Sequence, residues 1–322
     1  MTRILQADAA AIAEAATILR RGGLVAFPTE TVYGLGAVAL DEVAVRRIFA
    51  AKGRPANHPL IVHVQSSDGI ESLCARWPPA AALLAQRFWP GPLTLVLPRT
   101  AAVPAAVSGG GPTVAVRAPR HPVAQALLVA VGAPLAAPSA NRYQTLSPTT
   151  AAHVAASLGD EVELILDGGA CAAGIESTVV DLSDLRPRLL RPGAVSLSSL
   201  RELLPDLIVA APAPEPDAPH ASPGLDPRHY APHAELRVLP RAQLLATLAS
   251  ATQRVGVLAL GPIAAGTATV EVLAADPDAY AHGLYAALHR LDARCSLILA
   301  EAVPDGEAWL AVSDRLRRAS HR

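Results

Sequence analysis

Short apolar runs alternate with helix-like segments over the first 200 or so positions of the chain. The run LVAF at 24–27 has strand character, and residues 8–21 before it form an Ala-rich helical pattern that ends at Gly22. The segment 41–52 begins with acidic residues and ends with Lys52, an arrangement that suits the helix dipole. Strands that alternate with helices predict an α/β domain built on a twisted, mixed sheet.

The other predicted elements of this region follow from the same periodicities. We expect strands at 24–27, 60–64, 93–97, 113–117, 162–169, 177–182 and 188–193, and one from 134 that runs into a loop. We expect helices at 8–21, 41–52, 78–89, 121–132 and 147–159. In the last helix, Ser147 is the predicted N-cap and Pro148 the first helical residue. The segment PTETVYGLG at 28–36 is predicted to be a polar loop.

The pattern changes at residues 205–235, where 31 positions contain eight prolines. Proline fixes φ and removes a backbone donor, so this stretch is incompatible with a core helix or a central strand. We interpret it as a linker. Strand and helix patterns resume at 236–322 and predict a small Rossmann-like α/β domain. The predicted organisation is therefore a domain at 1–204, a proline-rich linker and a C-terminal domain.

Composition describes a compact protein that can form a core. Of 322 residues, 51% are hydrophobic and 17% charged, and the net charge of −1 gives no global basic field for nucleic acid. The basic C-terminal segment DRLRRASHR is predicted to be a solvated helix end. Acidic residues at 8 and 14 argue against a signal peptide, and no apolar run is long enough for a membrane span. The three cysteines lack C-x-x-C spacing, which predicts reduced, buried thiols in a cytoplasmic protein.

Known cofactor motifs are absent or weak in this sequence. No G-x-x-x-x-G-K-[ST] sequence occurs, which excludes a P-loop. A G-x-G-x-x-A pattern at Gly34, Gly36 and Ala39 is weak support for a dinucleotide, because six residues separate Gly34 from the strand before it. His58 and His63 lack further ligands at metal-binding spacing, so no protein-bound metal is expected.

Lys52 is the only lysine among 27 basic residues, and the other 26 are arginines. A single lysine in such a chain indicates a place that needs a compact ammonium group and not a planar guanidinium. Arg54 offers a fork of donors suited to phosphate or carboxylate. We interpret this Lys-x-Arg pair as an anion site; the structural alternative is a surface lysine at a helix C-terminus.

Polar side chains gather at the ends of the predicted strands, where open α/β sheets bind their ligands. The residues so placed are Thr29, Thr31, His63, Arg117, Ser139, Asn141, Ser177, Thr178 and Arg191. With Lys52 and Arg54 they supply four cations and several hydroxyls, a set that suits a nucleoside triphosphate together with a carboxylic acid. Each residue alone has a structural alternative, such as a loop hydrogen bond or a satisfied core histidine.

Seven ordered motifs within residues 10–195 give the chain a family resemblance. They are PTETVYGLG, KGRP with HPLIVHV, FWPGPLTLVL, VAVRAPRHP, PSAN with SPT, DGGACAAGIESTVVDL and LLRPG. Together they resemble the YrdC/Sua5 family, whose signature is a Lys-x-Arg and a Ser-x-Asn pair, here Lys52/Arg54 and Ser139/Asn141. The SPGLDPRHYAP segment and the domain after it resemble the long Sua5 form.

This resemblance implies a YrdC-like catalytic domain followed by a Sua5-type C-terminal domain, and the activity of a threonylcarbamoyl-AMP synthase. Such an enzyme joins L-threonine, bicarbonate and ATP into L-threonylcarbamoyladenylate and releases pyrophosphate. Its product is passed to a tRNA threonylcarbamoyl transferase for the N6-threonylcarbamoyladenosine modification, and tRNA itself would bind weakly. Mg²⁺ would arrive with the ATP phosphates.

The resemblance also assigns roles to individual residues. Threonine would be held by Thr31, His63, Arg117 and Ser177, with Arg117 on its carboxylate. ATP would contact Arg54, His58, Thr113, Ser139, Asn141, Ser147, Arg191 and Tyr230. Lys52 and Arg54 would be catalytic, with Lys52 where carbamate and phosphate meet. His229 and Tyr230 would belong to a lid that folds over the nucleotide.

The chain departs from the family pattern at two places. Arg142-Tyr143-Gln144 stands where Ser-Gly often follows the Ser-x-Asn pair, which predicts a stiffer loop. Leu225-Asp226-Pro227 stands where the lid commonly has Met-Lys-Tyr, so an anion replaces a cation near the polyphosphate. Two alternatives stay open: an O-carbamoyltransferase that uses carbamoyl phosphate and ATP, and an RNA-binding module, which the net charge and the few aromatic residues disfavour.

Overall fold

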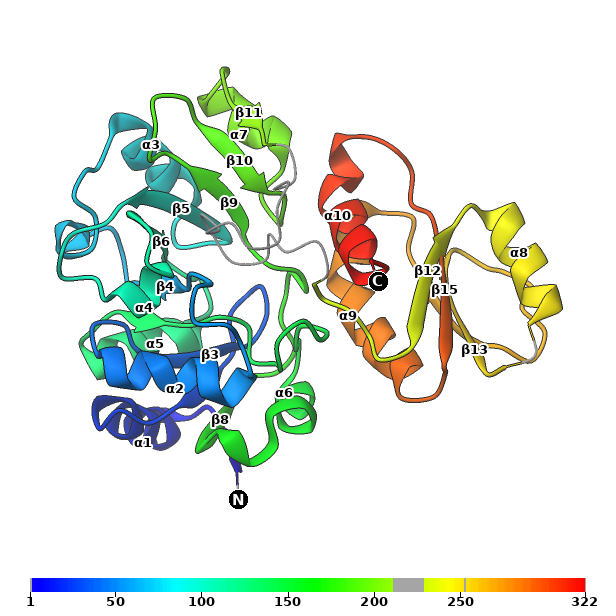
Figure 1. The fold of residues 1–322 in the computed structure, drawn as a ribbon, viewed down its shortest axis with the longest axis horizontal. Helices are drawn as coiled ribbons and strands as arrows, with labels where there is room; N and C mark the ends of the chain where they lie inside the picture. Colours follow the sequence, from blue (N-terminus) through cyan, green and yellow to red (C-terminus); the bar gives the residue numbers. More distant parts are fainter. Residues whose placement is uncertain (1, 211–228, 252, 322) are drawn as a thin grey trace.

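The structure is a computed structural model that describes residues 2–210, 229–251 and 253–321. Two α/β bodies lie side by side (Figure 1), each built on its own sheet. The larger, N-terminal body holds an 11-stranded sheet, and the smaller, C-terminal body holds a four-stranded one. This arrangement confirms the predicted fold class, while the predicted limits of the linker stay a prediction.

The large sheet mixes parallel and antiparallel pairs, as predicted. Its strands are β1 (Arg3–Gln6), β2 (Val25–Phe27), β3 (Gly34–Val38), β4 (Ile61–His63), β5 (Leu93–Pro98), β6 (Thr113–Arg117), β7 (Leu135–Ala136), β8 (Leu164–Asp167), β9 (Thr178–Asp181), β10 (Arg188–Arg191) and β11 (Ile208–Val209). Their spatial order is β1-β8-β2-β3-β7-β4-β6-β5-β9-β10-β11. Most of the central strands are fully buried, because helices cover them.

Side chains cap the N-terminal ends of most helices of this body. The helices are α1 (Ala9–Arg20), α2 (Glu42–Lys52), α3 (Pro79–Phe88), α4 (Ala105–Ser108), α5 (Pro122–Val131), α6 (Ala151–Leu158) and α7 (Leu197–Leu203). Asp41 caps α2 by accepting from the Ala44 amide at 3.1 Å. Gly53 ends α2 in the left-handed region with φ of 62°, a conformation that glycine adopts at little cost. This turn directs the chain from Lys52 to Arg54.

Several predictions for this body are wrong or incomplete. The strands β1, β3 and β11 and the helices α4 and α7 were not expected. PTETVYGLG is only partly a loop, since β3 begins at Gly34. A Cβ on Gly36 would lie 2.7 Å from Phe27 Cε1, so this glycine permits close packing of β2 on β3. The Gly-x-Gly pattern therefore serves packing and gives no support to a dinucleotide site.

The predicted cap of α6 is also wrong. The helix begins at Ala151, and Thr150 is its N-cap, accepting from the His153 amide at 3.3 Å. Ser147 lies three residues before the cap and makes a different contact, described below. A Ser-Pro pair fits a helix start, but a second hydroxyl of the same chemistry stands closer to the helical residues.

The C-terminal body has the predicted Rossmann-like layers. Its elements are β12 (Glu235–Leu239), α8 (Arg241–Ser250), β13 (Val255–Leu260), β14 (Thr269–Leu273), α9 (Pro277–Asp292), β15 (Leu297–Glu301) and α10 (Leu310–Ala319). The sheet order is β12-β15-β13-β14 and every pair is parallel. In Figure 1, α9 and α10 lie between this sheet and the N-terminal body, and α8 lies on the outer face.

The basic segment at the chain's C-terminal end is not a solvated helix end, contrary to the prediction. It forms α10, where Arg315 and Arg318 are only 1% and 3% exposed. Charged side chains are rarely buried unless they are paired. These buried arginines are therefore expected to have charged partners near the interface between the two bodies.

Other predictions concern redox state, membranes and the lid. The three cysteines, Cys74, Cys171 and Cys295, are unpaired and buried, as predicted. Burial raises the pKa of the Cys171 thiol to about 12, which makes it unreactive.

Within the described residues, no helix combines the length and apolarity needed to cross a bilayer. Leu225-Asp226-Pro227 of the predicted lid lies outside the described residues.

Candidate active site

Strand directions bring four predicted site residues to one edge of the large sheet. β4 and β6 run parallel with His63 opposite Arg117, so their carboxyl ends coincide. β5 is antiparallel to β6 and parallel to β9, which puts Ser177, just before β9, at the same edge. β10 returns antiparallel to β9 and ends there with Arg191. The edge thus gathers residues that are up to 128 positions apart in the sequence (63 to 191).

Arg117 is held in one orientation by three partners. Its Nη1 donates to Thr31 Oγ1 at 2.8 Å, and its Nε donates to the Gly91 carbonyl at 3.2 Å. Its Nη2 lies 2.8 Å from Glu30 Oε1 in an ion pair that is almost completely buried. Burial alone would raise the pKa of Glu30, but Arg117 offsets this and holds that pKa below its usual value. A fixed guanidinium of this kind suits a carboxylate ligand.

His63 lies beside Arg117 as a neutral imidazole. Burial, reinforced by the charge of Arg117, lowers the pKa of His63 to about 3. Its Nδ1 has no hydrogen-bond partner among the described residues. A buried polar atom without a partner is unusual in a folded protein. It marks a position where a ligand can make the missing hydrogen bond.

Ser177 and Arg191 contact each other directly. Arg191 Nε donates to the Ser177 carbonyl and Nη2 to Ser177 Oγ, both at 3.1 Å. Arg191 Nη1 lies 3.4 Å from the hydroxyl of Tyr230. Ser177 Oγ also lies 2.8 Å from Thr94 Oγ1. A predicted threonine residue, a predicted ATP residue and a predicted lid residue thus meet at one point.

Lys52 joins the Lys-x-Arg and Ser-x-Asn pairs through the main chain. Its Nζ donates to the carbonyl of Ser139 at 2.6 Å and to that of Asn141. Burial, followed by the charge of Arg54, lowers the pKa of Lys52 well below its usual value. An ammonium group has three donors, so one remains for an anion after the two carbonyls are satisfied.

Arg54 and His58 lie beside the loop in which the chain departs from the family pattern. The guanidinium of Arg54 lies 6.0 Å from the centre of the Tyr143 ring, and His58 meets that ring edge-on at 5.5 Å. His229 approaches the same ring at 6.2 Å. Tyr143 therefore links two predicted ATP residues to the predicted lid.

One small cavity is lined by many of these groups, although Lys52 is not among its lining residues. It has a volume of about 40 Å³, and the predicted site residues that line it are Thr31, Arg54, His63, Arg117, Ser139, Ser177, Arg191, His229 and Tyr230. A volume of this size holds only a few water molecules. Tyr230 is 1% exposed and has φ of 61°, a conformation that is uncommon for a residue with a side chain. His229 and Tyr230 therefore fill space in which a substrate would have to lie.

Four predicted ATP residues do not line this cavity. Asn141 Nδ2 donates to the carbonyls of Arg142 and Thr145 at 2.8 and 2.9 Å, which fixes the loop after β7. His58 packs on Tyr143, and Ser147 contacts Glu176. Thr113 is the first residue of β6, about 13 Å along the strand from Arg117. Its assignment to ATP stays a prediction.

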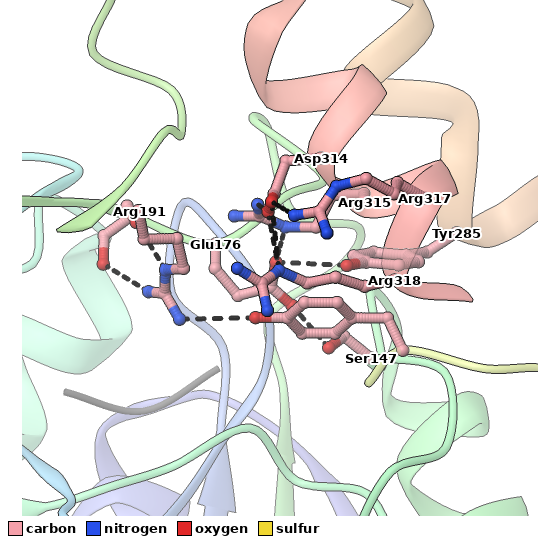
Figure 2. Close-up of polar contacts among 10 residues, drawn as sticks. Ser147, Glu176, Arg191, Tyr285, Asp314, Arg315, Arg317 and Arg318 are labelled. Carbon is pink, nitrogen blue, oxygen red and sulfur yellow. Dashed lines mark hydrogen bonds and ion pairs between the residues drawn. The ribbon is translucent and has the colours of Figure 1, made fainter. Parts of the chain in front are cut away.

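Sequence reasoning missed a second group of residues at this site. Glu176 lines the cavity next to Ser177, yet its partners Tyr285 and Arg315 come from α9 and α10 of the other body (Figure 2). The motif GIESTVV contains this buried acid, but nothing in the sequence indicates where its cation lies. Glu30 was missed in the same way within PTETVYGLG.

Comparisons with known proteins agree with this geometry. The sequence model of the Sua5, YciO and YrdC family, described as "Telomere recombination", matches residues 17–193. A second model, described as the C-terminal domain of threonylcarbamoyl-AMP synthase, matches residues 195–321.

Individual relatives match over nearly the whole chain. The threonylcarbamoyl-AMP synthase of Pyrococcus abyssi (strain GE5 / Orsay) is 45% identical over 95% of this chain and 93% of its own length. That of Bacillus subtilis (strain 168) is 40% identical over 96% of this chain and 92% of its own. The crystal structure of P. abyssi Sua5 complexed with L-threonine superposes with a TM-score of 0.92 at 43% identity, covering 99% of this chain and 97% of that one. The chain therefore belongs to the Sua5/YciO/YrdC family and carries the C-terminal domain of threonylcarbamoyl-AMP synthases.

Proposed function

We propose that the chain is a threonylcarbamoyl-AMP synthase, which converts L-threonine, bicarbonate and ATP into L-threonylcarbamoyladenylate and pyrophosphate. The observation that carries this proposal is the contact of Ser177 with Arg191, because it joins a pocket for a carboxylic acid to a group of cations suited to a nucleotide. The names of the relatives and the L-threonine in the P. abyssi structure support the same assignment.

The threonine half of the site would consist of Thr31, His63, Arg117 and Ser177. Arg117 would hold the carboxylate, because its charge is buried and its orientation is fixed by Thr31 and Glu30. His63 is neutral, so its unpartnered Nδ1 can accept a hydrogen bond from the ammonium or hydroxyl group of threonine. An imidazolium could not accept that bond.

The reaction would proceed through two bond-forming steps without a covalent enzyme intermediate. The deprotonated amine of threonine attacks the carbon of bicarbonate, the N–C bond forms, and water leaves to give a carbamate. A carbamate oxygen then attacks the α-phosphorus of ATP, the O–P bond forms, and the bond to pyrophosphate breaks. What the protein supplies is the alignment of the two substrates at the Ser177–Arg191 contact.

The cations on the nucleotide side would stabilise the charge that develops on the phosphates. Arg54, Arg191 and the remaining donor of Lys52 are buried, where such interactions are strong. The other residues that we assign to ATP are His58, Thr113, Ser139, Asn141, Ser147 and Tyr230. Mg²⁺ would come with the triphosphate, because this ion is usually bound through substrate phosphates.

His229 and Tyr230 would act as a lid. They line a cavity too small for both substrates, so they must move before threonine and ATP bind. Return of the lid would exclude water from the labile adenylate. The product would then pass to a tRNA threonylcarbamoyl transferase in the cytoplasm, and tRNA itself would bind weakly.

The proposal is tested by incubating the protein with ATP, isotope-labelled bicarbonate and each amino acid in turn, and identifying adenylates by mass. We expect labelled adenylate with L-threonine, and pyrophosphate release that requires both threonine and bicarbonate. Activity with carbamoyl phosphate in place of bicarbonate would favour the O-carbamoyltransferase. Tight tRNA binding without adenylate formation would favour the RNA-binding module.

A further inference from the structure

Glu176 is a buried carboxylate whose partners come from both bodies of the protein. Its Oε1 accepts from Ser147 Oγ at 2.5 Å, within the N-terminal body. Its Oε2 accepts from Arg315 Nε at 2.6 Å and from the Tyr285 hydroxyl at 3.1 Å, both in the C-terminal body. Figure 2 shows α10 placing Arg315 directly against this carboxylate. Glu176 is therefore shared between the candidate active site and the second domain.

Arg315 is itself fixed by its own helix and by the lid residue. The side chain of Arg315 is fully buried, and its Nη1 donates to Asp314 Oδ2 at 2.8 Å. Asp314 also accepts from Arg318 Nε at 3.0 Å and from Arg317 Nη2 at 2.7 Å, so this carboxylate links three arginines of α10. The guanidinium of Arg315 lies 5.1 Å from the centre of the Tyr230 ring. The position of Arg315 is thus determined before any substrate binds.

The charge of Glu176 would be harmful to nucleotide binding if it were left unpaired. Glu176 lines the same cavity as Arg191, which we assign to ATP. Burial alone would raise the pKa of Glu176, but Arg315 and then Arg191 hold that pKa below its usual value, so the carboxylate is ionised. Without Arg315, this anion would be compensated by Arg191 alone and would oppose an approaching triphosphate.

At the carboxyl ends of the C-terminal strands, the described polar groups around Glu301 are paired with one another. Ligands of parallel α/β sheets usually bind beyond the carboxyl ends of the strands. There, Glu301 at the end of β15 accepts from Arg241 at 3.2 Å and from the Leu260 amide at 2.9 Å. These groups satisfy one another across the strand ends. In the described part of the C-terminal domain, α9 and α10 direct Tyr285 and Arg315 toward the candidate active site at Glu176.

We propose that Arg315 is a positioning residue of the active site, supplied by the C-terminal domain. It neutralises Glu176, so that Arg191 is available to the nucleotide and Ser147 is held in place by the carboxylate. The second domain thereby completes the ATP half of the site, while the threonine half is built without it. This inference rests on the proposed function for the identity of the nucleotide, and on the contacts of Glu176 for the role of Arg315.

The test is a double-mutant cycle read out by binding, so that it does not depend on turnover. ATP affinity is measured by calorimetry for the full-length wild type, Arg315→Met, Glu176→Gln and the double variant. We expect R315M to weaken ATP binding by about tenfold or more, because it leaves the Glu176 charge without its main partner. We expect E176Q to change it by less than about threefold, because Arg315 stays paired with Asp314. The double variant removes both charges and should bind ATP within about threefold of the wild type.

Two further variants separate positioning from stability. Arg315→Lys keeps the charge but loses the planar fork, and we expect ATP affinity between those of R315M and the wild type. Arg201→Met removes an exposed ion pair with Glu307, which also joins the two bodies, and should leave ATP affinity unchanged. Melting temperatures identify any variant that fails to fold. If R315M does not fold, comparing the ATP affinities of R315K and the double variant with that of the wild type still tests the proposal.

The outcomes distinguish this inference from the proposed function. A double variant that binds ATP as poorly as R315M would overturn the positioning role, because restoring neutrality should restore affinity. Equal loss of threonine and ATP affinity in R315M would also overturn it, since that result indicates a general structural defect. If the wild type binds ATP but forms no labelled adenylate, the proposed function fails, and the cycle still tests whether Arg315 supports the nucleotide site.

Discussion

Two buried glutamates lie at the candidate active site, and they are neutralised in different ways. Glu30 pairs with Arg117, and both belong to the N-terminal body. Glu176 pairs with Arg315, which belongs to the C-terminal body. Both pairs are almost completely buried at about the same N–O distance, 2.8 Å and 2.6 Å. They differ in the part of the chain that provides the cation.

This difference divides the site into two halves. The first pair fixes Arg117, so the pocket that we assign to threonine is complete within residues 1–204. The second pair borders Arg191 and Ser147, so the nucleotide side requires the second domain. Removing one partner of a buried ion pair strongly destabilises a protein, because the other charge stays buried without compensation. Changes to the two pairs should therefore have separable effects on threonine and on ATP.

The largest effect should come from Lys52, which we assign to the nucleotide side and whose own contacts lie within the N-terminal body. Lys52→Ala should abolish pyrophosphate release that depends on threonine and bicarbonate. Lys52→Arg should lose roughly a hundredfold or more in rate, because a rigid fork cannot keep both carbonyl contacts and also reach an anion. A pyrophosphate assay on both variants measures this, and near-normal activity of K52R would refute the argument from the single lysine.

The second-largest effect should come from breaking the ion pair between Glu30 and Arg117. Arg117→Met should lower the free energy of unfolding by about 3–5 kcal/mol, because it leaves Glu30 buried and unpaired. The variant should also lose threonine binding, which calorimetry measures. Adding Glu30→Gln should recover much of the stability but not the threonine affinity. Recovery of threonine binding in the double variant would contradict the assignment of Arg117 to the carboxylate.

A smaller effect, on how the free energy of unfolding depends on pH, should distinguish Glu176 from Glu30. In the wild type the pKa values of Glu30 and Glu176 are held below 4.5, so their stabilising contributions are present above pH 4.5 and are lost as the pH falls through the folded-state values. In R315M, burial should dominate and raise the pKa of Glu176. The destabilisation caused by the unpaired Glu176 carboxylate should then decrease as the pH falls, since the protonated form needs no cation.

The stability difference between R315M and the wild type should therefore narrow between pH 8 and about pH 5. Denaturant unfolding at a series of pH values measures it. The groups that face Glu176 and enter the comparison are Ser147, Arg191, Tyr230, Tyr285 and Arg315. A difference that does not vary with pH would show that Arg191 alone keeps Glu176 ionised.

The sequence predicted the half of the site that lies within one domain better than the half that lies between two. Strand ends located His63, Arg117 and Arg191, because apolar periodicity defines strands and strand direction defines the edge. The single lysine indicated a special position, and its ammonium indeed contacts the Ser-x-Asn segment.

The sequence patterns could not predict which residues far apart in the chain would pair. Arg315 looked like part of a solvated helix end, because a basic run on a short helix is usually exposed. Ser147 looked like a helix cap, since Ser-Pro fits that position equally well. Thr150 caps the helix instead, and Ser147 contacts Glu176, which lies 29 positions away. Arg315 pairs with the same Glu176 from 139 positions away. Local propensity carries no information about such a partner.

Threonine binding to a chain that ends at residue 210, after β11, tests most directly whether the site has two separable halves. The variant E176Q is introduced into this shortened chain so that no unpaired buried charge remains, and its folding is checked by circular dichroism. We expect threonine affinity within about threefold of the full-length protein. Formation of threonylcarbamoyladenylate should fall by about thirtyfold or more, because the shortened chain lacks the lid residues His229 and Tyr230. Loss of threonine binding by a folded shortened chain would contradict the division of the site between the two domains.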